Sequence, residues 1–220
     1  MKKIKAPIAF LMIFTMVLSL TACGSADSKE ASSTQTSEAQ NTSGENVTAA
    51  EPEKESAEDT SASSDVLVAY FSATGTTKGV AERIAAVTGG DLYEILAAEP
   101  YTADDLNYND SSSRSTLEQN DKNARPEISS EDLSPEGYTT IYLGFPIWWG
   151  EEPRILDTFV EKYGFEGITV IPFCTSGGSG IGRSGLNMEA LAGTGTWLEG
   201  ARFDGSVTEA DLQSWIDGLK

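Results

Sequence analysis

The sequence contains no histidine, and only two of its 220 residues are cysteines. Without an imidazole, the chain cannot form a serine–histidine or cysteine–histidine catalytic pair, and it lacks a common ligand of zinc and copper sites. We therefore predict no metal site and assign no catalytic side chain.

Basic residues are also few, because 15 lysines and arginines stand against 34 aspartates and glutamates. The formal net charge is −19, and repulsion from phosphate groups argues against a nucleic acid as partner. Beyond favouring solubility, the negative charge would steer basic partners toward the protein and would disfavour the addition of electrons to a bound redox group.

Long apolar runs are rare, and one of them lies at the N-terminus. Lys2, Lys3 and Lys5 precede an apolar segment from Ile8 to Leu20, and small residues lead up to Cys23. The pattern resembles a bacterial lipoprotein signal. It predicts a signal peptide over residues 1–22, a lipid on Cys23 and a lipid-anchored, extracytoplasmic location at the cell membrane. A plain secretory signal with an incidental cysteine is the alternative.

Residues 24–64 contain no aromatic residue and, among the larger aliphatic side chains, only Val47. Such a segment buries too little apolar surface to offset the conformational entropy that folding costs. We predict a lipidated Cys23 followed by a disordered acidic tether up to residue 64. Residues 65–220 are enough for one domain with one sizeable core, and Cys174 then has no partner for a disulfide.

Apolar runs alternate with helical patterns across this domain. The predicted strands cover residues 66–71, 92–96, 138–144, 168–173 and 196–203. The first run, Val66 to Phe71, is apolar without alternation, which is typical of strands buried on both faces of a parallel sheet. The alternation predicts an α/β fold with an open, doubly wound, five-stranded parallel sheet. In such sheets ligands bind at the carboxyl ends of the strands, where the strand order reverses.

A loop rich in hydroxyl groups, residues 72–77, joins the first predicted strand to a helix. The free N–H groups and the positive dipole end of a helix make such a junction an anion site. The spacing does not fit the triphosphate-binding motif G-x-x-x-x-G-K-[ST], and no G-x-G-x-x-G follows this strand. An ordinary capped turn is the alternative for this short stretch taken alone.

The same loop resembles the phosphate loop of flavodoxins, [ST]-x-T-G-x-T. The resemblance implies the flavodoxin strand order 2-1-3-4-5 and noncovalently bound FMN as cofactor. The residues that would hold its phosphate are Ser72, Thr74, Gly75, Thr76 and Thr77.

Two adjacent tryptophans follow the third predicted strand, and a planar aromatic ligand explains them better than the core does. The stretch from Gly144 to Glu151 is similar to the flavin-stacking loop of flavodoxins, G-x-P-T-W-x-x-G-E, with one glycine displaced by one position. By this resemblance Trp148 stacks on the isoalloxazine ring and the Trp149–Gly150 peptide faces N5. The candidate cofactor-binding residues are Pro146, Ile147, Trp148, Trp149 and Gly150.

The loop after the fourth predicted strand is rich in glycine, which allows close backbone approach to the uracil-like edge of a flavin. Its candidate residues are Thr175, Ser176, Gly177, Gly178 and Gly182. Gly180-x-Gly182-x-x-Gly185 fits the dinucleotide motif but begins too far past the strand, so we reject that interpretation. Flavodoxins usually carry a tyrosine in this loop, and none is present. Cys174, just before the loop, is more typical of a small buried side chain than of a redox group.

Together these features predict an FMN-binding, flavodoxin-like electron-transfer lipoprotein. Its partners would be redox proteins or small-molecule electron donors and acceptors, with membrane contact through the lipid. Two alternatives stay open: an FMN-dependent NAD(P)H or quinone oxidoreductase, and a lipoprotein that binds flavin or another phosphorylated ligand without redox function.

Overall fold

The computed structural model describes residues 64–219, so the predicted signal peptide, Cys23 and nearly all of the tether lie outside the described residues. The strands are β1 (Val66–Tyr70), β2 (Asp91–Glu94), β3 (Thr140–Pro146), β4 (Thr169–Thr175), β5 (Thr196–Trp197) and β6 (Ala201–Phe203). The helices are α1 (Thr76–Thr88), α2 (Arg114–Asn120), α3 (Arg154–Lys162), α4 (Ser184–Ala192) and α5 (Glu209–Asp217), with a 3₁₀ turn at Pro135–Gly137. Within the described residues no helix has both the length and the apolar character that a membrane span requires.

All strands are parallel and lie in the order β2-β1-β3-β4-β5, with β6 also paired to β4. The predicted open, doubly wound sheet and its strand order are confirmed. From β1 the chain first adds β2 on one side and then returns to add β3 on the other. The carboxyl ends of β1 and β3 therefore form the point at which the order reverses.

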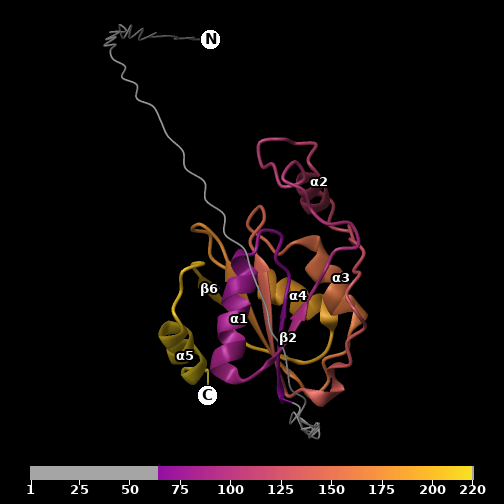
Figure 1. Ribbon diagram of the computed structural model, residues 1–220. Coiled ribbons are helices and arrows are strands. Elements are labelled where there is room, and N and C mark those ends of the chain that lie inside the picture. Colours follow the sequence, from indigo (N-terminus) through magenta and orange to yellow (C-terminus); the bar gives the residue numbers. More distant parts are fainter. Residues whose placement is uncertain (1–63, 220) are drawn as a thin grey trace, which may run out of the picture. The chain divides into compact units, whose positions relative to one another are not determined.

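Helices cover both faces of the sheet (Figure 1), with α1 and α5 on one face and α3 and α4 on the other. Each face has its own apolar cluster. Val80 and Ile84 of α1 pack with Leu212 of α5 on one side, and Phe159 of α3 packs with Met188 of α4 on the other. The helices thus follow from apolar residues at helical spacing, and their packing holds the strand ends in place.

The fifth predicted strand, residues 196–203, is split into β5 and β6. Leu198 N donates to Val170 O of β4 at 3.0 Å, but Pro172, two residues further along the same edge, has no N–H to continue the ladder. The chain bulges here, and a Cβ on Gly200 would lie only 2.6 Å from Pro172 O. Pairing resumes where Phe173 meets Ala201.

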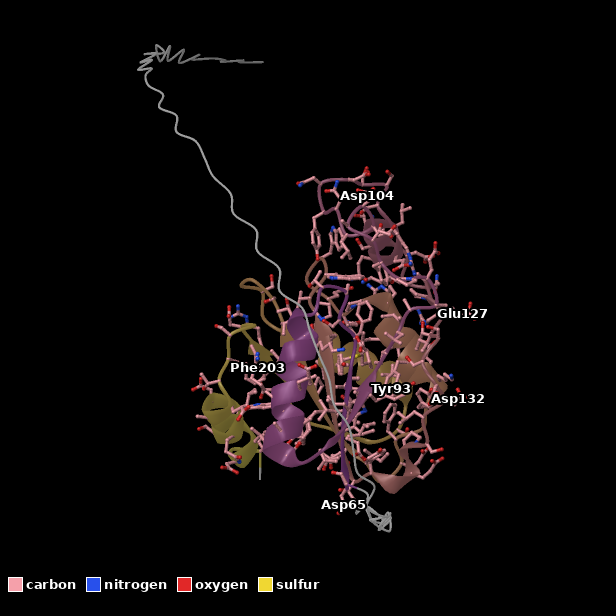
Figure 2. The ribbon with its side chains drawn as sticks, in the orientation of Figure 1. Asp65, Tyr93, Asp104, Glu127, Asp132 and Phe203 are labelled. Atoms are coloured by element: carbon pink, nitrogen blue, oxygen red, sulfur yellow. The ribbon has the colours of Figure 1, made fainter. Side chains whose placement is uncertain are left out.

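The segment between β2 and β3 extends beyond the carboxyl ends of the strands and carries α2 (Figure 1). Asp104 in this segment lies at the opposite end of the domain from Asp65 (Figure 2). The sequence predicts a short helix here within residues 111–123 and little other order; the helix is shorter, and side-chain contacts hold its surroundings. The Arg114 guanidinium, for example, lies 4.0 Å from the ring centre of Tyr101.

Candidate functional site

A cavity of about 510 Å³ opens at the carboxyl ends of β1, β3 and β4. Its volume falls in the range of roughly 300–1,000 Å³ that small-molecule sites occupy. Ten of the fifteen predicted cofactor-binding residues line it: Ser72, Thr74, Thr76, Thr77, Pro146, Ile147, Trp148, Thr175, Ser176 and Gly177. The other five do not form its wall: Gly75, Trp149, Gly150, Gly178 and Gly182.

Besides Ala73 of the loop over residues 72–77, four further lining residues were not among the candidates from the sequence: Leu106, Tyr108, Asp204 and Gly205. The first two lie in the segment between β2 and β3, where no motif marks them. The last two follow β6, and their position at the carboxyl end of a parallel strand was a usable signal.

The first turn of α1 provides the anion-binding groups of the cavity. Gly75 precedes the helix with φ of 86°, no side chain caps the helix start, and no acidic residue lies in its first turn. The N–H groups of that turn and the positive helix dipole therefore remain available to a ligand. The hydroxyl oxygen of Ser72 is buried and has no hydrogen-bond partner within the described residues. A buried hydroxyl without a partner is costly, and rotation of the Ser72 side chain toward an anion in the cavity would remove that cost.

The buried hydroxyl groups of Thr77 and Thr175 are 2.8 Å apart and join the first turn of α1 to the end of β4. One hydroxyl donates to the other, which leaves the proton of the second hydroxyl for another acceptor. The pair both fixes the two loops and offers one donor to the cavity.

A fixed negative charge also lies at the cavity wall. The Asp204 carboxylate accepts hydrogen bonds from the backbone N–H and the hydroxyl of Ser206, which lower its pKa. The neighbouring Gly205 lies close to Thr76, since an added Cβ would be 2.8 Å from the Thr76 methyl. This carboxylate therefore weakens the positive potential near the α1 start.

The two adjacent tryptophans have different environments. Trp148 is only 3% exposed and packs edge-on against Phe71 and Tyr101, with ring centres 5.6 and 5.1 Å away. Trp149 is 40% exposed, and its ring centre lies 4.5 Å from that of Tyr108. Trp148 thus exposes little surface to the cavity, and the larger exposed aromatic surfaces belong to Tyr108 and Trp149.

Residues 148–151 form a tight turn, called the 148–151 turn below. Trp148 N donates to Glu151 O at 2.9 Å, and Glu151 N donates back to Trp148 O at 3.0 Å. The two central residues, Trp149 and Gly150, have φ of 49° and 84°, which is the type I′ pattern. A positive φ is uncommon for a bulky residue, so neighbouring groups must hold Trp149 in this conformation.

A cluster of buried polar side chains lies directly behind this turn. The Gln119 amide donates to the carbonyl oxygens of Trp148 and Glu152, at 2.9 and 3.2 Å. The Arg154 guanidinium donates to the Glu151 carboxylate at 2.6 Å and to the Asp157 carboxylate at 3.1 Å. Glu152, Arg154 and Asp157 are each at most 3% exposed.

Burial determines the protonation of this cluster. Desolvation raises the pKa of Asp157 to about 6, although its hydrogen bond with Arg154 acts in the opposite direction. For Arg154, burial by itself would lower the pKa, but hydrogen bonds to Glu151 and Asp157 outweigh it and leave the pKa raised. Arg154 is therefore a permanent buried cation, while Asp157 can take up a proton just below neutral pH.

The fold and the cavity define a doubly wound α/β protein with an anion-binding loop at the point where the strand order reverses. A sequence model of the flavodoxin family matches residues 65–219, and the chain therefore belongs to this family.

Solved structures agree with this assignment. A putative flavoprotein from Bacteroides eggerthii is 44% identical, with 70% of this chain and 96% of that chain covered and a TM-score of 0.66. One from Bacteroides uniformis is 42% identical, with 70% and 98% covered and a TM-score of 0.67. A Lactobacillus acidophilus flavoprotein, solved in complex with FMN, shares the fold at 22% identity, 69% and 97% coverage and a TM-score of 0.51. No protein with a curated description matches the chain.

The raised pKa of Asp157 predicts how stability depends on pH. Because the folded protein binds this proton more tightly than the unfolded chain, the stabilisation is complete below about pH 4 and is lost as the pH rises through about 6. Asp157→Asn removes this dependence. Between about pH 5 and pH 8, the free energy of unfolding of the wild type, measured with urea, should therefore fall by roughly 1 kcal/mol relative to that of the variant. A difference in unfolding free energy between the two proteins that stays constant with pH would show that Asp157 does not titrate in this range.

Proposed function

We propose that the protein binds FMN noncovalently and carries electrons. The observation that carries this proposal is the buried hydroxyl of Ser72, which has no partner in the described residues and lies beside the uncapped start of α1 in the cavity wall. This arrangement fits a phosphate group. Support also comes from the family, from the two Bacteroides flavoproteins and from the FMN complex of the Lactobacillus protein.

In this proposal the phosphate accepts hydrogen bonds from Ser72, Thr74 and Thr76 and from the first-turn N–H groups of α1. These donors are neutral, so the helix dipole supplies the favourable potential that a lysine or arginine would otherwise give. FMN supplies the reversible uptake of electrons, while the protein binds the cofactor, orients it and excludes water.

The flavin ring would lie against the aromatic side chains of the cavity. Tyr108 lines the cavity and packs on Trp149, so it provides an aromatic wall although the loop after β4 has no tyrosine. Ser176 and Gly177 line the side that would meet the pyrimidine edge. Arg202 holds this loop, because its guanidinium donates to Ser176 O at 2.6 Å.

The large negative charge favours a carrier that exchanges electrons with basic partners. The partners in this proposal are redox proteins or small-molecule electron donors and acceptors. Steady turnover of NAD(P)H or a quinone by the purified flavin complex would instead identify an oxidoreductase. Ligand binding without reversible reduction would identify a non-redox binding protein.

The direct test compares the affinities of the purified protein for FMN and for riboflavin, which lacks the phosphate. FMN should bind more tightly, and Ser72→Ala combined with Thr74→Val should weaken FMN by about a hundredfold or more, since hydrogen bonds to charged groups contribute roughly 1.5–3 kcal/mol each. Riboflavin should bind the variant and the wild type equally. Ser111→Ala, which removes an exposed hydroxyl that does not line the cavity, is the control. Equal losses for both ligands would contradict the phosphate assignment.

The aromatic wall is tested by Tyr108→Leu and Trp149→Leu. Each change should weaken FMN and riboflavin alike by several-fold, because an aromatic pair contributes roughly 0.5–1.5 kcal/mol beyond its buried area. Part of the flavin fluorescence quenched on binding should also return. Tyr138→Leu, before β3 at the other end of the sheet, is the control. Unchanged quenching and affinity in both variants would place the ring against Trp148, as the family resemblance implies.

We further propose that a lipid on Cys23 attaches the protein to the outer face of the cell membrane. The support is the N-terminal pattern of basic, apolar and small residues before Cys23. Cys23→Ser should move the protein from the membrane fraction to the soluble fraction of cells that express it, because the lipid supplies the apolar surface for membrane binding. Lipidation would be contradicted if the variant stayed in the membrane fraction, or if it migrated like the wild type on a denaturing gel.

A further inference from the structure

We propose that Gln119 and Arg154 are positioning residues that hold the 148–151 turn in its type I′ form and thereby preorganise the site for the flavin ring. This inference rests on the FMN-binding function proposed above. It assigns a role to a cluster that lies behind the cavity wall and does not itself line it.

Gln119 holds the first residue of the turn and the residue that follows the turn. It belongs to α2, in the segment between β2 and β3, and it lies 29 residues before Trp148 in the chain. Its amide nitrogen donates to the carbonyl oxygens of Trp148 and Glu152, so the two N–H donors of one side chain bracket the turn. Gln119 is 6% exposed, and therefore water does not replace these hydrogen bonds readily.

Arg154 makes the second set of contacts that fix the turn. One of its terminal nitrogens binds the Glu151 carboxylate at 2.6 Å and approaches Gln119 O at 3.5 Å, so the same guanidinium contacts both the turn and α2. Its other terminal nitrogen lies 3.1 Å from Asp157 and 3.7 Å from Glu152. The Asn187 amide of α4 donates to Glu152 at 3.2 Å. Three helices therefore converge behind one four-residue turn.

The turn needs such support because Trp149 has a positive φ, a conformation that a bulky side chain rarely adopts. The turn also determines where the exposed ring of Trp149 meets Tyr108, which lines the cavity. The loop after β4 approaches from the other side, since a Cβ on Gly182 would lie 3.4 Å from Gly150 O. A loosened turn would thus displace the aromatic wall and leave the phosphate donors of the loop after β1 unchanged.

The test uses Gln119→Leu, which keeps the approximate size of the side chain and removes both donors. In the protein without flavin, amide hydrogen exchange at Trp148 and Glu151 should be about tenfold faster than in the wild type, because opening of the turn becomes easier. FMN and riboflavin should both bind about tenfold more weakly, since a disordered turn must be ordered on binding. Leu117→Gln on the exposed side of the same helix should leave exchange and both affinities unchanged.

A second variant, Gln119→Glu, separates positioning from packing. An ionised glutamate has no donor for the two carbonyl oxygens, whereas a protonated one has a single donor. The affinity of this variant for riboflavin, relative to the wild type, should therefore improve as the pH falls from about 8 to about 5. A role in packing alone would give a ratio that does not change with pH. This variant also decides the matter if Gln119→Leu does not fold.

The charged groups that face the side chain at position 119 come from the 148–151 turn, from α3 and from the residues after α2. Glu151, Glu152 and Arg154 lie at the turn and the start of α3, and Asp157 lies behind Arg154 on the same helix. Lys122 after α2 pairs with Glu151. All five are present in the wild type too, so the ratio of the two affinities reports what the new carboxylate at position 119 changes.

The outcomes distinguish the two proposals. A wild-type protein that binds no flavin would overturn the proposed function and the inference that rests on it. Tight flavin binding by the wild type, together with unchanged exchange or unchanged affinities in Gln119→Leu, would overturn the inference alone. Faster exchange with an equal loss of FMN and riboflavin, and a pH-dependent ratio for Gln119→Glu, would support it.

Discussion

The parallel alignment of β1, β3 and β4 is the constraint on which the site depends. Tyr70 pairs with Gly144, and Gly144 with Phe173, so the three strands end within two residues of one another and their loops begin at one edge of the sheet. The register requires a glycine at 144, because a Cβ there would lie 2.2 Å from the Phe173 ring. A larger residue would displace the buried Phe173 ring of β4 from its position against β3. The geometry of the cavity therefore follows from backbone pairing before any ligand is considered.

The starts of α5 and α1 differ in whether groups of the chain itself cap the free N–H groups and offset the positive end of the helix dipole. At the start of α5, Thr208 caps the Asp211 amide and two carboxylates lie in the first turn, so the positive dipole end is neutralised internally. At the start of α1 there is no side-chain cap and no carboxylate in the first turn, and the buried Ser72 hydroxyl has no partner in the described residues. Both helices obey the same physical rules, and the difference between them marks α1 as the helix whose complement comes from outside the chain.

The parts of this structure that the sequence predicts are those that depend on residues adjacent to one another in the chain. The apolar run of β1, the hydroxyl loop and the helical spacing of α1 are contiguous, and they led to the fold and to most of the cavity wall. The split of the fifth strand was accessible too, since Pro172 removes a donor from β4. The different environments of the two tryptophans could not be predicted, because they depend on the positive φ of Trp149 and on a contact with Tyr108 from a distant segment. Gln119 likewise meets the turn only through the tertiary fold.

The buried charges behind the 148–151 turn are difficult to explain by stability alone. Glu152, Arg154 and Asp157 are removed from water, and single polar atoms of Gln119, Arg154 and Asp157 are buried without hydrogen bonds within the described residues. Apolar side chains of similar volume commonly stabilise a fold as well as a buried ion pair does, or better. The two apolar clusters on the faces of the sheet provide the stability that can offset this cost. Directional hydrogen bonds can select one turn conformation, which apolar packing does less well. The location of these charges directly behind a turn with an unfavourable backbone conformation therefore fits a role in fixing the shape of the site.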